Sequence, residues 1–171
     1  MLKDVAPRIS HVAVLMDPGN AVEVYLFKAL DAAGRTPGVT PISIEVASPT
    51  QFDPTTTTRA RADALYVTPT TTNNAHRQAI FDLAAKHRLP AMYSERDWVD
   101  KGGLMSYWAN WMDLRWQEAV YVDKILKGTK SGGLPVRDPT TFELIINLKT
   151  AKALGLTIPP SLLQRADEVI Q

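Results

Sequence analysis

Short apolar runs alternate along the chain with polar turns and amphipathic stretches. The runs at 12–16, 64–67 and 91–93 each pass into small polar residues before the chain turns helical. Strand, polar turn and helix, repeated in this order, are typical of a parallel sheet with helices packed against it. We therefore predict an α/β fold of three layers, with a parallel sheet flanked by helices.

The apolar periodicity sets the bounds of the expected elements. Alternating or continuous apolar residues predict strands at 11–16, 41–47, 62–67, 89–93, 104–107 and 142–146. Helical periodicity predicts helices at 20–33, 73–87, 110–127 and 148–154, and a last helical turn from Ser161. Asn20 and Glu23 have capping-box spacing, and Gly34 suits a C-cap. The crossover at 49–58 contains four consecutive threonines, so we expect it to be short and the least ordered.

Polar side chains follow the strands at the points where three of them end. Ligands of parallel α/β sheets bind beyond the carboxyl ends of the strands, so these side chains are candidates for a small-molecule site. The candidates are Asp17, Asn20, Thr68, Thr70, Ser94 and Glu95. Helix N–H groups beside Asn20 would attract a carboxylate, and Glu95 would hold an ammonium group. The same residues also have purely structural interpretations: Asn20 could cap the helix that follows it, and Glu95 could form a surface ion pair with Arg96.

The helix expected at 110–127 has an apolar arc that covers more than half of its circumference. One face holds Trp111, Leu114, Ala119, Val122, Ile125 and Leu126, and the arc extends through Met112, Trp116 and Val120. A surface helix of a complete domain shows a narrower stripe. We therefore expect the helix at Trp111–Leu126 to be covered on two sides and, without another cover, to mediate association into a homodimer or larger species.

Composition removes several classes of function. The 171 residues are 45% hydrophobic, which is enough for one globular domain with a buried core. The 19 basic and 18 acidic residues are interspersed without a basic stripe, so we do not expect nucleic acid as a partner. No apolar stretch reaches the roughly 18 residues of a membrane span, so we expect no membrane insertion. The absence of cysteine excludes disulfides, thiolate nucleophiles and cysteine-ligated metals.

The pattern of reactive residues gives little support to catalysis. His76 and His87 are eleven positions apart, so one helix cannot bring both to a single metal ion. No nucleophile–histidine arrangement, phosphate loop or metal-ligand spacing is present, and we expect no catalytic residue, metal or cofactor. Two alternatives stay open: a small α/β enzyme that uses Asp17, Glu95 and Asp97 as acids and bases, and a flavodoxin- or receiver-like domain with the same alternation.

Several strings in the sequence resemble a single family. They are LMDPGN at 15–20, RADALYV at 61–67, FDLAAKHRLPAMY at 81–93, GGLMSY at 102–107, YVDKILKG at 121–128 and NLKTAKALGLTIPPSLLQRADEVI at 147–170. Together they resemble the substrate-binding proteins of bacterial ABC importers, in the branch grouped with tryptophan- and tyrosine-type binding proteins. The resemblance implies one lobe of a type I periplasmic-binding fold, no catalysis, an amino acid or similarly small anion-bearing ligand, and an ABC permease as partner of the full-length protein.

Members of this family have a signal peptide and two lobes, and this chain resembles the later part of such a protein. The resemblance implies that residues 1–101 and 139–171 form the second lobe, and that 102–138, the crossing segment and long helix, pack on the first. Ser106 and Tyr107 then lie at the hinge, where Tyr107 would stack on a ligand. The resemblance implies a periplasmic location. Because the printed chain starts without an apolar signal region, we expect the chain as given to remain cytoplasmic.

Overall fold

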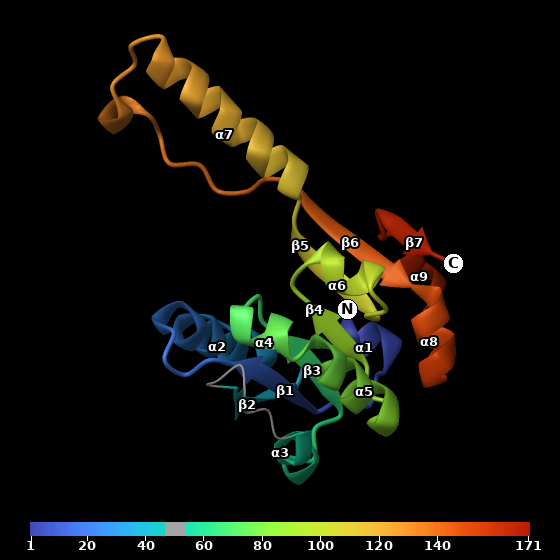
Figure 1. Cartoon of the computed structure of the whole chain (residues 1–171). Helices are drawn as coiled ribbons and strands as arrows, with labels where there is room; N and C mark the ends of the chain where they lie inside the picture. The colour runs from blue at the N-terminus through green and yellow to red at the C-terminus, as the bar shows by residue number, and fades with distance from the viewer. Residues whose placement is uncertain (47–53) are drawn as a thin grey trace.

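The computed structural model describes residues 1–46 and 54–171, and these residues form a seven-stranded sheet (Figure 1). The strands are β1 (His11–Met16), β2 (Thr40–Glu45), β3 (Ala64–Val67), β4 (Ala91–Tyr93), β5 (Met105–Ala109), β6 (Phe142–Asn147) and β7 (Glu168–Ile170). Their order across the sheet is β2-β1-β3-β4-β5-β6-β7. The neighbours from β2 to β5 pair in parallel, β6 is antiparallel to β5, and β7 is parallel to β6.

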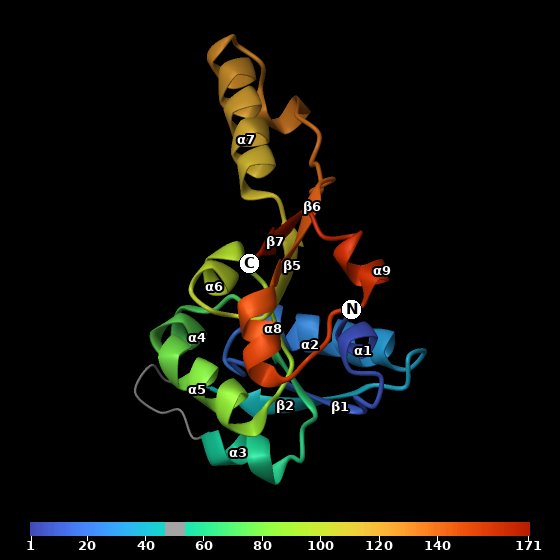
Figure 2. The same cartoon turned by 90° about the vertical axis from the view of Figure 1, so that its right-hand side faces the viewer.

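Helices cover both faces of this sheet. They are α1 (Leu2–Val5), α2 (Ala21–Gly34), α3 (Pro54–Arg59), α4 (Thr71–Ala75), α5 (Arg77–His87), α6 (Arg96–Asp100), α7 (Trp111–Leu126), α8 (Leu148–Leu154) and α9 (Pro160–Leu163), with a 3₁₀ turn at Ser131–Gly133. Figure 2 shows α1 and α2 on one side of the sheet and α3 to α5 on the other. This confirms the predicted three-layer α/β architecture. Within the described ranges, no helix is both long enough and apolar enough to cross a bilayer.

Strand β1 shows how the sheet directs side chains into both layers. Ala13 and Leu15 are buried in a core cluster with Ile80 of α5. Val12, one position away, is buried on the opposite face, where it lines a groove together with Leu30 of α2. Successive side chains of a strand point to opposite faces, so a strand covered on both faces is apolar throughout. This explains the continuous apolar run in the sequence.

Most predicted elements are confirmed, and the differences have local causes. The helix expected at 73–87 begins earlier, at Thr71, because the Thr70 hydroxyl accepts from the Asn73 N–H, and it is divided into α4 and α5 at His76, whose backbone (φ −98°, ψ 13°) departs from helical geometry. Helices α1 and α6 and strand β7 were not predicted, and each has five residues or fewer. The sheet is also not wholly parallel, because α7 and the segment that follows it extend away from the sheet, so the chain enters β6 from the same edge at which it leaves β5 (Figure 1).

The threonine-rich crossover can be compared only in part. Residues 47–53 lie outside the described ranges, so the end of the strand expected at 41–47 and the start of the crossover at 49–58 stay predictions. The described part contains α3, a helix of six residues, which agrees with the expected short helix. The prediction that this crossover is the least ordered is not tested by it.

Helix α7 stands away from the rest of the molecule in both views (Figures 1 and 2). Asn110 caps it by accepting the Asp113 N–H at 2.8 Å, and the Tyr121 hydroxyl donates to the Pro135 carbonyl on the returning chain at 2.6 Å. None of its residues is buried. Its exposed large apolar side chains are Trp111, Met112, Trp116, Val120, Val122, Ile125 and Leu126. We call this surface the α7 apolar face.

Candidate functional site

The carboxyl ends of the parallel strands meet at one edge of the sheet, which we call the carboxyl edge. Leu15 of β1 is in register with Val67 of β3, Val67 with Tyr93 of β4, and Tyr93 with Ser106 of β5. The turns that follow β1, β3 and β4 therefore lie side by side, as the strand-end rule predicts. Strand β5 continues beyond this level to Ala109, and α7 projects from the same edge (Figure 1).

The turn after β1 is held by a carboxylate that the sequence analysis assigned differently. Glu23 is buried, and its Oε2 accepts the Asp17 N–H at 2.7 Å, whereas the capping-box spacing predicts that it binds the Asn20 N–H. The Asp17 Oδ1 accepts from the Gly19 N–H at 2.8 Å, and the Asn20 Oδ1 accepts from Val22 at 3.0 Å. Asn20 is therefore the N-cap of α2, and Glu23 positions the turn that precedes it.

Two predicted hydroxyls connect neighbouring strand ends. The buried Thr68 hydroxyl donates to the Leu15 carbonyl at 2.7 Å, and the buried Ser94 hydroxyl donates to the Val67 carbonyl at 3.0 Å. Asn73, which the sequence analysis missed, donates through Nδ2 to the carbonyls of Leu15 and Thr68, each at 3.0 Å. The hydroxyl protons of Thr68 and Ser94 are thus donated to backbone carbonyls of the sheet. Direct contact of these two hydroxyls with a ligand stays a prediction.

Glu95 is the predicted polar group that is left without a partner at this edge. It lies just before α6 with its side chain partly exposed, and it forms no ion pair with the described residues. Its expected pairing with Arg96 is wrong, because the Arg96 guanidinium binds both oxygens of Glu168, at 2.6 and 2.9 Å, and also Asp100. Thr70, by contrast, uses its hydroxyl to cap α4.

An ion-pair network braces the turn that carries Glu95. Asp97 accepts from Arg77 at 2.7 Å and from Lys101 at 2.9 Å, and the Arg77 guanidinium lies 4.7 Å from the centre of the Trp98 ring. Hydrogen bonds from Lys101 and then Arg77 hold the pKa of Asp97 below its usual value. An ionised carboxylate with two cationic partners is a poor general acid or base, which argues against the enzyme alternative. Arg77 was not identified from the sequence, because its role depends on the packing of α5 against α6.

The crossing segment contributes one buried and one open side chain. Ser106 is buried and lines a recess of about 10 Å³ at the foot of α7, together with Trp111 and Glu143. The Tyr107 side chain is 41% exposed, and its ring stacks on Phe142 at 5.6 Å between ring centres. An aromatic surface that is supported from one side and open on the other can receive a flat apolar group.

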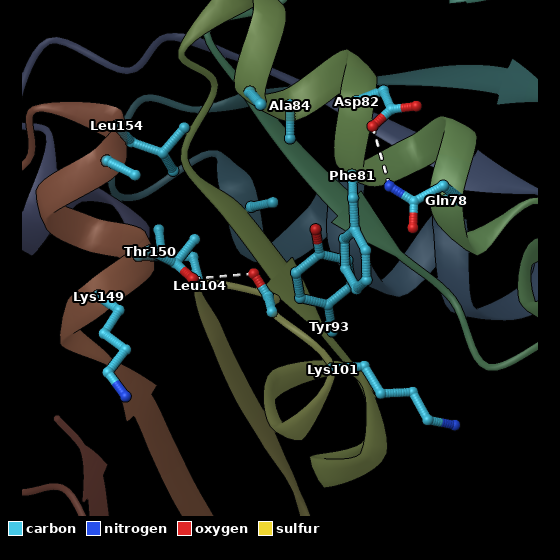
Figure 3. Close-up of a pocket in the computed structure, with 14 residues that line it drawn as sticks. Gln78, Phe81, Asp82, Ala84, Tyr93, Lys101, Leu104, Lys149, Thr150 and Leu154 are labelled. Atoms are coloured by element: carbon cyan, nitrogen blue, oxygen red, sulfur yellow. Dashed lines mark hydrogen bonds between the residues drawn. The ribbon is translucent and has the colours of Figure 1, made fainter.

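Two sizeable hollows lined by described residues lie over the faces of the sheet, away from the carboxyl edge. One, of about 440 Å³, lies between α5 and α8 (Figure 3). The other, of about 320 Å³, is lined by apolar residues of α1, α2 and the opposite sheet face. Neither hollow is lined by Asp17, Thr68, Ser94 or Glu95.

The comparison with protein families decides which kind of protein this is. The family described as ABC transporter substrate binding protein matches residues 1–170. The chain belongs to this family. It is a family of transporter binding proteins and not of enzymes, which removes the acid–base alternative that uses Asp17, Glu95 and Asp97, and it is not a flavodoxin or receiver family.

Solved structures agree with the family and show how much of it the chain represents. A conserved domain protein from Vibrio cholerae O1 biovar El Tor is 25% identical to this chain, with a TM-score of 0.86. The match covers 98% of this chain and 57% of that protein. An ABC domain from Streptococcus pneumoniae in complex with L-Trp is 26% identical to this chain, with a TM-score of 0.88. The match covers 99% of this chain and 58% of that domain. The third structure is a ligand-free, open substrate binding protein with adhesive properties from Clostridium difficile. It is 20% identical to this chain with a TM-score of 0.75, which shows the fold alone, and the match covers 99% of this chain and 57% of that protein. Comparison with curated proteins gives no match.

Proposed function

We propose that this chain is the second-lobe part of a solute-binding component of an ABC importer, and that its carboxyl edge forms one wall of a site for an amino-acid-like ligand. The observation that carries the proposal is the meeting of three polar turns and Tyr107 at one edge of the sheet in a chain of this family. The ligand class is supported by the Streptococcus pneumoniae relative, which was solved with L-Trp.

The residues at this edge offer complementary groups for each part of an amino acid. The first turn of α2, held by Asp17 and Asn20, presents backbone N–H groups and the positive end of the helix dipole to a carboxylate. Glu95, whose carboxylate forms no ion pair with the described residues, offers that carboxylate to the ammonium group. Tyr107 offers its open ring to the side chain. Thr68 and Ser94 connect neighbouring strand ends and Thr70 caps α4, so these hydroxyls fix the shape of the edge, and Ser106 is buried beside it.

The second wall is proposed to come from a first lobe. The chain spans 57–58% of the length of the solved relatives, and the α7 apolar face projects from the carboxyl edge without cover in the described residues. We propose that the segment 102–138 reaches this lobe through α7, while β5 at its start stays paired in the sheet, and that 1–101 and 139–171 form the second lobe. Ligand would close the two lobes about the β5–β6 crossing. The complete protein would act outside the cytoplasm and deliver its ligand to an ABC permease.

The proposal predicts weak but specific binding by this chain. One wall buries about half of a ligand, so L-tryptophan is expected to bind with a Kd on the order of 1 mM or weaker, measured by saturation-transfer NMR titration. Glu95→Gln is expected to weaken this binding about tenfold, because it removes a charge-assisted hydrogen bond. Glu118→Gln makes the same change on α7, where the carboxylate is paired with Arg115, and is expected to leave binding unchanged. Equal binding by Glu95→Gln and the parent would contradict the proposed role of Glu95.

A further inference from the structure

The hollow between α5 and α8 lies over one face of the sheet and is lined by none of the residues proposed to contact a ligand at the carboxyl edge. It has a volume of about 440 Å³, within the range of small-molecule pockets. Its floor includes Ala91 and Tyr93 of β4 and Leu104, which precedes β5. Its apolar walls come from Phe81 and Ala84 of α5 and from Leu154 of α8 (Figure 3). We call it the α5–α8 groove.

Most polar side chains that line the groove already have partners. Gln78 donates to Asp82 at 2.9 Å, and the Thr150 hydroxyl donates to the Gly102 carbonyl at 2.9 Å, as Figure 3 shows. Lys101 pairs with Asp97, which lies outside the groove. These groups are therefore engaged within the protein, and they leave few polar groups for a ligand.

The hydroxyl of Tyr93 is a polar group that the groove leaves available. The residue is 1% exposed, and its ring is held between Trp98, stacked at 4.9 Å, and Phe81, edge-on at 5.7 Å. Figure 3 shows the hydroxyl directed into the space between α5 and α8, and no hydrogen bond from a described residue contributes to its pKa. Burial raises the pKa of Tyr93, so the phenol stays neutral and remains a donor. The Tyr93 oxygen is not one of the fully buried polar atoms that lack a partner, so it is accessible from the groove, where a ligand's acceptor can take the place of water.

The charges around the groove balance. The ion pair of Lys101 with Asp97 is neutral as a unit, and Lys149 of α8 and Asp82 of α5 add one charge of each sign on opposite walls, without forming an ion pair with each other. In Figure 3 the ammonium groups of Lys101 and Lys149 also point away from the groove. An ionic ligand would therefore lose hydration without gaining an opposite charge at close range.

We propose that the α5–α8 groove is a second binding site, which takes a small neutral organic molecule with an apolar body and one hydrogen-bond acceptor. The apolar walls receive the body, and the Tyr93 hydroxyl donates to the acceptor. This site is separate from the carboxyl edge and does not depend on the first lobe, because all of its lining residues belong to α5, α8, β4 and the segment before β5.

Benzamide tests the proposal as a neutral probe, and benzoate serves as its charged counterpart. In ¹H–¹⁵N spectra of the ¹⁵N-labelled chain, benzamide is expected to shift the amide signals of Ala84, Leu104 and Thr150, and benzoate is expected to shift them less. Tyr93→Phe keeps the ring and removes the donor, and it is expected to weaken benzamide binding about three- to tenfold. Because the change keeps the shape of the side chain, the fold should be retained.

A pair of tryptophan variants separates the groove from the rest of the surface. Ala153→Trp places a ring in the groove and is expected to abolish the shifts, whereas Lys152→Trp, on the exposed side of the same helix, is expected to preserve them. If Ala153→Trp does not fold, Ala85→Trp on the facing wall replaces it. The proposal is overturned if benzamide leaves these signals unmoved, if the blocked variant responds like the parent, or if benzoate binds as tightly as benzamide.

Discussion

Replacing Gly103 with alanine is expected to lower the free energy of unfolding by about 3 kcal/mol, the upper part of the range for overpacked cores. A Cβ at this position would lie 2.7 Å from the Tyr93 ring and 2.8 Å from the Trp98 carbonyl oxygen. Neither atom can move easily, because the Gly103 N–H donates to that same carbonyl at 2.8 Å and the Tyr93 ring is stacked on Trp98. Urea unfolding monitored by tryptophan fluorescence measures the change.

Gly133→Ala is the matched control for this substitution. Nothing lies within 4 Å of a Cβ at Gly133, and its backbone is not in the left-handed region, so its free energy of unfolding is expected to change by less than about 0.5 kcal/mol. If both variants unfold at the same urea concentration, the close packing of Gly103 against Tyr93 and Trp98 is not what holds α6 on the sheet, and the description of the turn that carries Glu95 must change.

A second large effect is expected at the α7 apolar face. Trp116 is 72% exposed and Met112 is 78% exposed, and they are four residues apart on the same side of the helix. Apolar surface of this kind is ordinarily covered by another protein surface. We therefore expect the chain on its own to associate at micromolar concentration, as measured by sedimentation velocity, and Met112→Glu with Trp116→Glu to weaken the association at least about a hundredfold.

The control for association adds a negative charge without touching the apolar face. Lys130→Glu lies in the exposed segment that follows α7, and it is expected to sediment like the parent. A strictly monomeric parent at high micromolar concentration would contradict the assignment of this face as a contact surface. Association that the double variant leaves intact would place the contact elsewhere.

The fold could be predicted where the local pattern alone decides the structure. The bounds of β1 and α8 agree with the sequence prediction because one has a continuous apolar run and the other ends at Gly155, which adopts the left-handed C-cap conformation. The antiparallel direction of β6 could not be predicted, since a strand has the same two-residue period in either direction. Helix α6 was missed because five residues are too few to show a helical period.

The site could be predicted to the level of its turns but not of its individual bonds. The strand-end rule places Asp17, Thr68 and Ser94 at one edge, and the strand register agrees. That Thr68 and Ser94 donate to carbonyls of neighbouring strands depends on contacts between residues 27 and 53 positions apart, which no local pattern contains. The same is true of the Arg77 ion pair with Asp97.

The central claim is that the carboxyl edge is the ligand-binding wall of this chain, and chemical-shift mapping with L-tryptophan tests it most directly. In ¹H–¹⁵N spectra, millimolar L-tryptophan is expected to move the amide signals of Gly19, Asn20, Glu95 and Tyr107 while the signals of α8 stay in place. Shifts confined to the α5–α8 groove, or no shift at any of these four residues, would contradict the claim.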